Sequence, residues 1–147
     1  AYALKTPMSP HAAADIDQVR IALDDIIPPK TENHLIIEGA GGLLVPLNES
    51  DTILDLIRPD YEVIIVSRHY LGSINHTLLT LKALTDIGIK PYILFSGNEH
   101  ITTEAIIRSK SGLPILGRLE EQAEFNKEVV RSLAEGLKPA LREYQLL

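Results

Sequence analysis

The 147-residue chain contains no cysteine and no tryptophan, and only 5% of its residues are aromatic. The absence of cysteine excludes disulfide bonds, thiolate metal sites and a cysteine nucleophile. It is also typical of proteins from a reducing compartment, so we expect a cytoplasmic protein. The apolar runs are only a few residues long, and the first residues lack the basic-then-apolar pattern of a secretion signal. We therefore expect neither a membrane span nor an export signal.

Basic residues are in the minority: 14 lysines and arginines stand against 20 aspartates and glutamates, giving a net charge of -6. Because binding to phosphate backbones needs clustered Lys and Arg, we expect no nucleic-acid partner. The five histidines show no HExxH-like spacing, which argues against a zinc site. With 45% hydrophobic and 23% charged residues the composition is that of an ordinary globular protein. We expect residues 1–147 to form a single α/β domain.

Short apolar runs rich in Ile, Val and Tyr alternate with longer amphipathic stretches. The short runs predict strands at residues 35–38, 63–67, 92–96 and 114–117. The longer stretches predict helices at residues 52–57, 73–87, 103–109 and 126–144, the last one interrupted near Gly136 and Pro139. Such alternation predicts a doubly wound, mainly parallel sheet with helices on both faces.

The N-terminal part is expected to carry one more helix. Residues 15–18 resemble a capping box, and apolar residues from Ile16 to Ile26 then share one helical face before Pro28 ends the helix. The preceding Ser9-Pro10-His11 segment is interpreted as a plain loop, because proline restricts both itself and the residue before it.

In a doubly wound sheet, ligands bind beyond the carboxyl ends of the strands. Glu38 ends the first predicted strand and is followed by Gly-Ala-Gly-Gly, a turn that allows positive φ angles and close approach of the backbone to a ligand. A carboxylate there suits Mg²⁺ bound to nucleotide phosphates, and the N–H groups of Ala40 to Gly42 could form an anion-binding nest. A tight turn with a solvated glutamate is the alternative.

A second candidate follows the second predicted strand, where Leu71-Gly72-Ser73-Ile74-Asn75 opens a helix. Ser73 is the expected N-cap, and free N–H groups with the Asn75 amide would hold a carboxylate. An ordinary capped helix without a ligand remains the alternative. After the third strand, Ser96 and Asn98 could offer polar groups to a nucleotide base, although turns commonly have this composition.

Three segments, taken together, resemble the dethiobiotin synthetase family: SPHAAA at residues 9–14, IIEGAGGLLVPLN at residues 36–48 and LGSINHTLLTLKAL at residues 71–84. The resemblance implies a P-loop NTPase-like fold and a homodimeric, cytoplasmic enzyme of biotin synthesis. Such an enzyme makes dethiobiotin from 7,8-diaminononanoate, CO₂ and ATP with Mg²⁺, through a carbamate and a carbamic-phosphoric anhydride.

The same resemblance implies roles for individual residues. Glu38 would be the metal ligand and, with Gly41, a catalytic residue, and Glu38, Ser96 and Asn98 would contact the nucleotide. The substrate, shared between two subunits, would be bound by Gly41, Gly42, Leu71, Gly72, Ser73 and Asn75.

The chain also departs from the family. It contains no GxxxxGK(S/T) loop, and Ser96 stands where the family has an adenine-reading Asn. The chain begins without Met, and we expect it to be the C-terminal portion of such a protein, inactive alone. Two alternatives stay open: a related amidoligase of the same ATPase superfamily, and a degenerate, non-catalytic dimerisation module.

Overall fold

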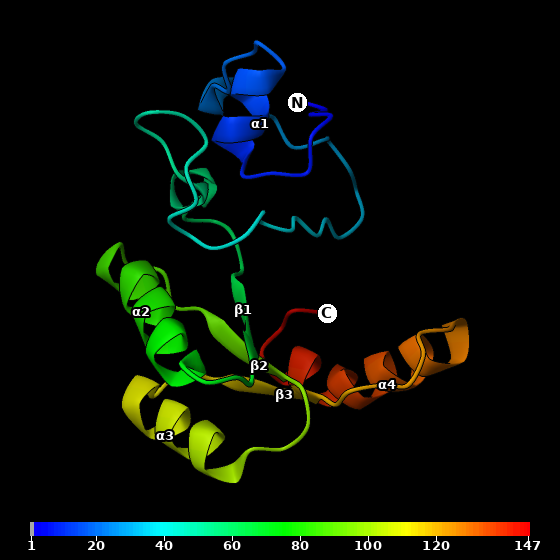
Figure 1. Ribbon diagram of the computed structural model, residues 1–147. Coiled ribbons are helices and arrows are strands. Elements are labelled where there is room, and N and C mark those ends of the chain that lie inside the picture. The colour runs from blue at the N-terminus through cyan, green and yellow to red at the C-terminus, as the bar shows by residue number, and fades with distance from the viewer. Residues whose placement is uncertain (1) are drawn as a thin grey trace. The chain divides into compact units, whose positions relative to one another are not determined.

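The computed structural model describes residues 2–147 (Figure 1). Contacts between residues divide the chain into two compact units, one ending at Pro59 and the other spanning Asp60–Leu147. Each unit is described by itself below. The expectation that residues 1–147 form a single domain stays a prediction.

The second unit is built on a parallel sheet. Its strands are β1 (Ile64–Arg68), β2 (Tyr92–Ser96) and β3 (Ile115–Leu119), in the order β1-β2-β3. The middle strand β2 is the most buried of the three, because it has a hydrogen-bonded neighbour on both edges and side chains packed on both faces. All three strands were expected from the sequence, and the α/β prediction is confirmed.

One face of this sheet is covered by helices α2 (Ser73–Asp86) and α3 (Ile101–Ser111). Ile93 and Phe95 point to this face from alternate positions of β2 and pack with Leu81 of α2 and Ile107 of α3. All four side chains are at most 3% exposed. They form the core that fixes both helices against the strands.

The opposite face is covered by helix α4 (Lys127–Glu143), which lies apart from α2 and α3 in Figure 1. The rings of Tyr92 and Tyr144 are 5.4 Å apart, and a Cβ on Gly117 would lie 3.2 Å from Leu137 Cδ2. Helices therefore lie on both faces, as predicted. The predicted interruption is wrong, since α4 runs on through Pro139. This helix has no buried residue, so water can hydrate the carbonyl that proline leaves unpaired.

The first unit begins with helix α1 (Pro10–Ile16), which corrects two predictions. Ser9-Pro10-His11 is not a plain loop: Ser9 is the N-cap and Pro10 the first helical residue, where its missing N–H costs nothing. The helix expected from Ile16 to Ile26 does not form. Gln18 adopts a φ of 56°, and the N–H groups of Gln18 and Val19 donate to the Asp15 and Ala14 carbonyls, which ends α1.

The rest of this unit holds two short 3₁₀ helices, η1 (Leu23–Asp25) and η2 (Ile53–Leu56). The second replaces the helix expected at residues 52–57, and a capping box between Thr52 and Asp55 starts it. Ala14, Ile21 and Leu47 form the buried centre of this unit.

The strand expected at residues 35–38 is wrong. The segment is not in a strand, and Leu35, Ile36 and Ile37 are 44%, 92% and 57% exposed. An apolar run becomes a strand only where a neighbouring strand pairs with its backbone. Within residues 2–59 the structure has only one isolated antiparallel bridge, between Pro46 and Thr52. A strand at residues 35–38 therefore has no pairing partner there.

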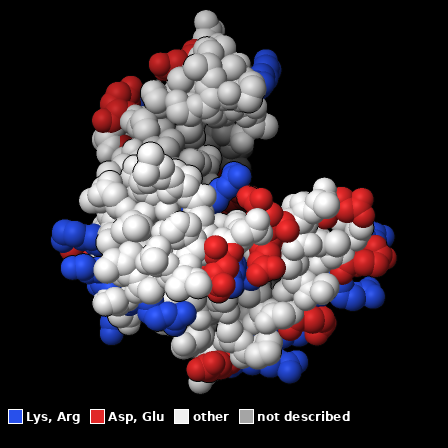
Figure 2. Space-filling model, turned by 60° about the horizontal axis from the view of Figure 1, so that its bottom comes forward, with Lys and Arg blue, Asp and Glu red and all other residues white. Residues whose placement is uncertain are grey.

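Among residues 2–147, no helix is both long and apolar enough to cross a membrane. On the face drawn in Figure 2, acidic and basic side chains are interspersed, and no continuous basic surface is visible. This distribution agrees with the net charge of -6.

Candidate functional site

The carboxyl ends of the three strands lie side by side, because the sheet is parallel. The register pairs Arg68 with Ser96 and Ser96 with Leu119. The segments that leave these strands therefore start from one edge of the sheet, where ligands bind in folds of this type. The predicted residues Leu71 to Asn75, together with Ser96 and Asn98, belong to this edge.

The turn from β1 into α2 depends on a glycine. Gly72 is the N-cap of α2, with φ 100° and ψ -8°, a left-handed conformation that other residues rarely adopt. The prediction that Ser73 is the N-cap is wrong, because Ser73 is the first helical residue and is buried. Its N–H donates to the Tyr70 carbonyl at 3.0 Å. The Ser73 N–H is therefore not available to an anion, and the start of this helix has one N–H donor fewer than expected.

Other groups around this turn face solvent. Leu71 is fully exposed and Asn75 is exposed. Tyr70 Oη and His76 Nδ1 are 2.6 Å apart, and their rings lie 5.7 Å from each other. A Cβ on Gly72 would be 3.7 Å from His76 Cε1, so the imidazole borders the turn. The arrangement offers a helix N-terminus, an exposed amide and an apolar side chain, which suits a carboxylate on an aliphatic chain.

The turn after β2 places Ser96 at the strand end and Asn98 in solvent. The Ser96 carbonyl accepts from the His69 N–H at 3.2 Å, and the Gly97 N–H donates to the Leu119 carbonyl at 2.9 Å. Gly97 has a φ of 106°. These bonds continue the hydrogen bonding of the sheet beyond the strand ends, and the Asn98 side chain stays accessible to a ligand.

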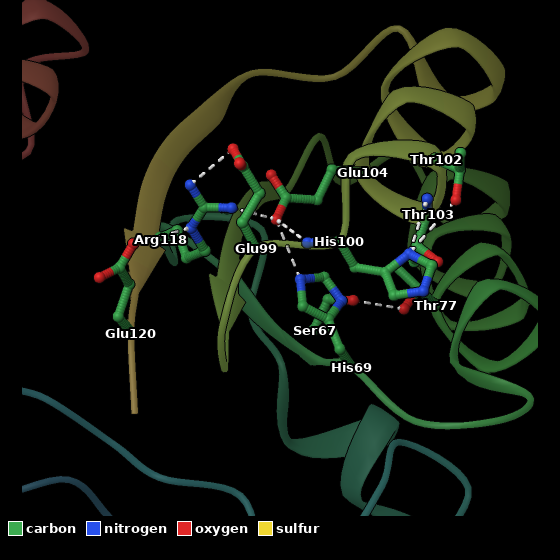
Figure 3. A network of polar contacts seen from close by, with 10 residues as sticks. All are labelled: Ser67, His69, Thr77, Glu99, His100, Thr102, Thr103, Glu104, Arg118 and Glu120. Atoms are coloured by element: carbon green, nitrogen blue, oxygen red, sulfur yellow. Dashed lines mark hydrogen bonds and ion pairs between the residues drawn. The ribbon is translucent and has the colours of Figure 1, made fainter. Parts of the chain in front are cut away.

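The sequence did not point to a polar network at the same edge, which Figure 3 shows from close by. Glu104 of α3 is its centre: Oε1 lies 3.0 Å from His69 Nε2 and 2.7 Å from Arg118 NH1. Arg118 also donates to Glu99 at 3.0 Å, and its Nε lies 3.9 Å from Glu120. The network thus joins the ends of β1 and β3 to the start of α3.

The network sets the ionisation of its own members. Burial raises the pKa of Glu104, but hydrogen bonds from His69 and from the His100 N–H, with the charge of Arg118, outweigh burial and bring that pKa below its ordinary value. The hydrogen bond to Glu99 is the main cause that raises the pKa of Arg118. Glu104 is therefore a carboxylate at neutral pH, and Arg118 is a cation.

One signal in the sequence could have revealed this network. Arg118 lies inside the otherwise apolar strand β3, and its side chain is only 21% exposed. A charged group in a strand covered by helices needs a partner of opposite charge. Glu104 stands in the first turn of the preceding helix, a position that faces the strand ends.

The Glu38 turn belongs to the first unit. Glu38, Gly41 and Gly42 are exposed and irregular in structure. Gly41 has a φ of 86°, and a Cβ on it would lie 2.8 Å from Val45 Cγ2, so both backbone angle and packing require glycine there. At Gly42 a Cβ would meet nothing within 4 Å. The open side of this turn is at Gly42.

Among residues 2–147 no group of three or more His, Asp or Glu side chains could hold a metal ion. Glu38 is thus a single carboxylate beside a glycine turn. This donor set does not suit zinc or calcium, which take most of their ligands from the protein. It does fit Mg²⁺, which uses one or two protein carboxylates and completes its shell with water and phosphate oxygens.

Comparison with known proteins adds the last observations. A family profile described as an AAA domain matches residues 1–129. ATP-dependent dethiobiotin synthetase BioD of Christiangramia forsetii is 54% identical over 144 residues, which cover 97% of this chain and 70% of the relative. The proteins of the same name from Cytophaga hutchinsonii and Nitrobacter hamburgensis are 49% and 41% identical over 91% and 89% of this chain. The matched residues make up 66% and 63% of those two relatives, and no solved structure matches.

Proposed function

We propose that the chain takes part in forming dethiobiotin from 7,8-diaminononanoate, CO₂ and ATP, because it belongs to the dethiobiotin synthetase family, a family of ATP-dependent ligases. The observation that carries this proposal is the 54% identity to the Christiangramia forsetii synthetase over 97% of the chain. The exposed turn before α2 supports it, since the substrate has a carboxylate at the end of an aliphatic chain.

We assign the two turns to different parts of the reaction. Leu71, Gly72 and Asn75 would bind the distal carboxylate, with Leu71 against the aliphatic chain and Asn75 as an amide donor. Ser73, which is buried and whose N–H is bonded to the Tyr70 carbonyl, would hold the turn rather than contact the ligand. Gly41 and Gly42 would let the backbone approach the reacting carbamate or phosphate groups. Glu38 would bind Mg²⁺, whose charge would offset that of the nucleotide phosphates. Ser96 and Asn98 would contact the nucleotide.

In this reaction one amine of the substrate adds CO₂ to form a carbamate. The carbamate oxygen takes the γ-phosphoryl group of ATP and ADP leaves, after which the second amine attacks the carbonyl carbon and phosphate leaves. Chemistry of this kind depends on positioning and charge neutralisation rather than on a protein nucleophile. A chain without cysteine is compatible with that. We also propose a homodimer with the substrate site shared between subunits, in the cytoplasm.

Two substitutions test the assignment, in the complete polypeptide that the gene encodes. Asn75→Ala should raise KM for diaminononanoate by about tenfold with KM for ATP unchanged, because a hydrogen bond to a charged group is worth about 1.5–3 kcal/mol. Asn75→Asp should be worse, since it sets a carboxylate against a carboxylate. Leu79→Ala, at a 58% exposed position of the same helix, is the control.

Glu38→Gln should lower kcat and the dependence on Mg²⁺ together, while Glu32→Gln, another exposed glutamate of the same unit, should change neither. An unchanged Mg²⁺ dependence would remove Glu38 from the metal. If Asn75→Ala weakened both substrates equally, the assignment of the α2 turn to the substrate tail would be wrong.

A further inference from the structure

His69 connects the polar network to the turn that starts α2. Its side chain is 10% exposed, and the centroid of its ring lies 5.5 Å from that of Phe95 and 6.1 Å from that of His100. Its backbone N–H is bonded to the Ser96 carbonyl, and its Nε2 lies 3.0 Å from Glu104 Oε1 (Figure 3). Both the backbone and the ring of His69 are therefore fixed to neighbouring elements.

The chain has little freedom between His69 and the helix. Only Tyr70, Leu71 and Gly72 separate His69 from Ser73, which is buried and whose N–H is bonded to the Tyr70 carbonyl. A buried hydroxyl pair, with Ser67 Oγ and Thr77 Oγ1 2.7 Å apart, joins β1 to the next turn of α2. A displacement of the His69 backbone would therefore pass to residues 70–72, which include Leu71 and Gly72, two of the predicted substrate contacts.

The hydrogen bond between His69 and Glu104 has a defined direction. Glu104 is ionised at neutral pH and can only accept, so Nε2 of His69 carries the proton and donates it. In the neutral ring Nδ1 is then unprotonated, and it is buried without a hydrogen-bond partner. Arg118 supplies the opposite charge to the same Glu104 oxygen at 2.7 Å. Glu104 thus holds the ring through its single bonded nitrogen.

We propose that Glu104, neutralised by Arg118, is a positioning residue that acts through His69 to hold the residue 70–72 turn in the geometry that binds the substrate carboxylate. The proposal rests on the proposed function for the identity of that substrate. Neither Glu104 nor Arg118 belongs to the residues that the sequence marked as contacts. The proposed role of Glu104 is to hold in place a turn whose Tyr70 and Leu71 side chains are exposed to solvent.

The test compares two glutamates that contact the same arginine. Glu104→Gln removes the charge that holds His69, whereas Glu99→Gln removes the charge of another partner of Arg118 that does not contact His69. Glu104→Gln should raise KM for diaminononanoate by about fivefold and leave KM for ATP within about twofold, because charge-assisted hydrogen bonds are roughly twice as strong as neutral ones. Glu99→Gln should leave both KM values unchanged.

Substitutions of His69 provide a second test of the proposal if Glu104→Gln folds poorly. His69→Ala should reproduce the rise in KM, and His69→Gln, whose amide keeps an N–H donor for Glu104, should restore KM to within about twofold of the wild type. A residue that only contributed to global stability would lower the melting temperature without this pattern. Equal effects of His69→Ala and His69→Gln would overturn the proposal.

Amide hydrogen exchange in the absence of substrate gives a readout that does not depend on catalysis. The Ser73 N–H, which is bonded across the turn, should exchange about fivefold faster in Glu104→Gln and His69→Ala and at the wild-type rate in Glu99→Gln. Unchanged Ser73 exchange, or faster exchange with an unchanged KM, would overturn the proposal. If the wild type makes no dethiobiotin, the proposed function fails, and Ser73 exchange still decides whether Glu104 holds the turn.

Discussion

Gly72→Ala tests whether the turn into α2 requires a left-handed residue. Gly72 has φ 100°, and a Cβ on it would make only ordinary contact with His76 Cε1 at 3.7 Å. The expected cost is therefore backbone strain alone, about 1–2 kcal/mol. Replacing glycine also removes conformations from the unfolded chain, which offsets the strain by up to about 1 kcal/mol.

Gly136→Ala is the matched control, because it changes the unfolded chain in the same way. Gly136 lies inside α4 without a positive φ, and a Cβ there would meet nothing within 4 Å. Alanine should stabilise that helix by about 0.5–1 kcal/mol. The unfolded-state contribution cancels between the two variants. Their unfolding free energies should thus differ by the backbone strain alone, about 1–2 kcal/mol, with Gly72→Ala the less stable variant.

Urea unfolding followed by tyrosine fluorescence suits this comparison. Four of the five tyrosines, Tyr61, Tyr70, Tyr92 and Tyr144, lie in the Asp60–Leu147 unit that contains both glycines. The signal therefore reports mainly on the unit that is changed. If the unfolding free energy of Gly72→Ala were equal to that of Gly136→Ala, or higher, the reasoning about the turn would be refuted.

Further predictions concern the core and the polar network of the same unit. Thr77→Val should lower the free energy of unfolding by about 1–3 kcal/mol, because it leaves the buried Ser67 hydroxyl unpaired. In the same urea titration, the double variant with Ser67→Ala should recover part of that loss. Ile107→Ala should lower the free energy of unfolding by about 2–5 kcal/mol, because the Ile107 side chain is fully buried. Ile106→Ala, at a 37% exposed position, should lower it clearly less. Similar losses for the two variants would contradict the placement of α3. Because the pKa of Glu104 is below its ordinary value of 4.5, the carboxylate stabilises the fold above that pH, and this contribution is lost as the pH falls through the lower folded-state value. The stability difference between wild type and Glu104→Gln should therefore be complete at pH 7 and shrink in acid; a difference that grows in acid would reverse the sign.

The sequence predicted the elements whose signal is local. β2 is bounded by Pro91 and Gly97 and contains a run of apolar residues, so its limits were predicted to the residue. The helix at residues 73–87 was predicted from its apolar face and observed as Ser73–Asp86. These elements carry their own stop signals, which explains the agreement.

The errors occur where other parts of the chain decide the structure. Residues 35–38 have the composition of a strand but find no strand to pair with within residues 2–59. The apolar spacing from Ile16 to Ile26 looked helical, yet the left-handed Gln18 ends α1 and turns the chain there. Pro139 was expected to break a helix, but the exposed surface of α4 tolerates it.

The candidate site was likewise predicted only where the signal is local. Parallel strand order alone predicted that the residues after β1 and β2 share one edge, and the structure brings Leu71 to Asn75, Ser96 and Asn98 to that edge. The His69–Glu104–Arg118 network could not be read from spacing, because it joins residues from three elements 14 and 35 positions apart. The roles of Glu38, Gly41 and Gly42 stay predictions.

The most direct test of the proposed function is the product of the complete encoded polypeptide. It should be supplied with 7,8-diaminononanoate, bicarbonate, ATP and Mg²⁺, and dethiobiotin and ADP should be quantified by mass spectrometry. The proposal predicts equal amounts of the two products, with none formed when diaminononanoate is omitted. Amide formation from ammonia or glutamine would indicate an amidoligase, and failure to bind Mg·ATP, seen as no thermal shift, would indicate a non-catalytic module. Either result, in place of dethiobiotin, would contradict the proposed function.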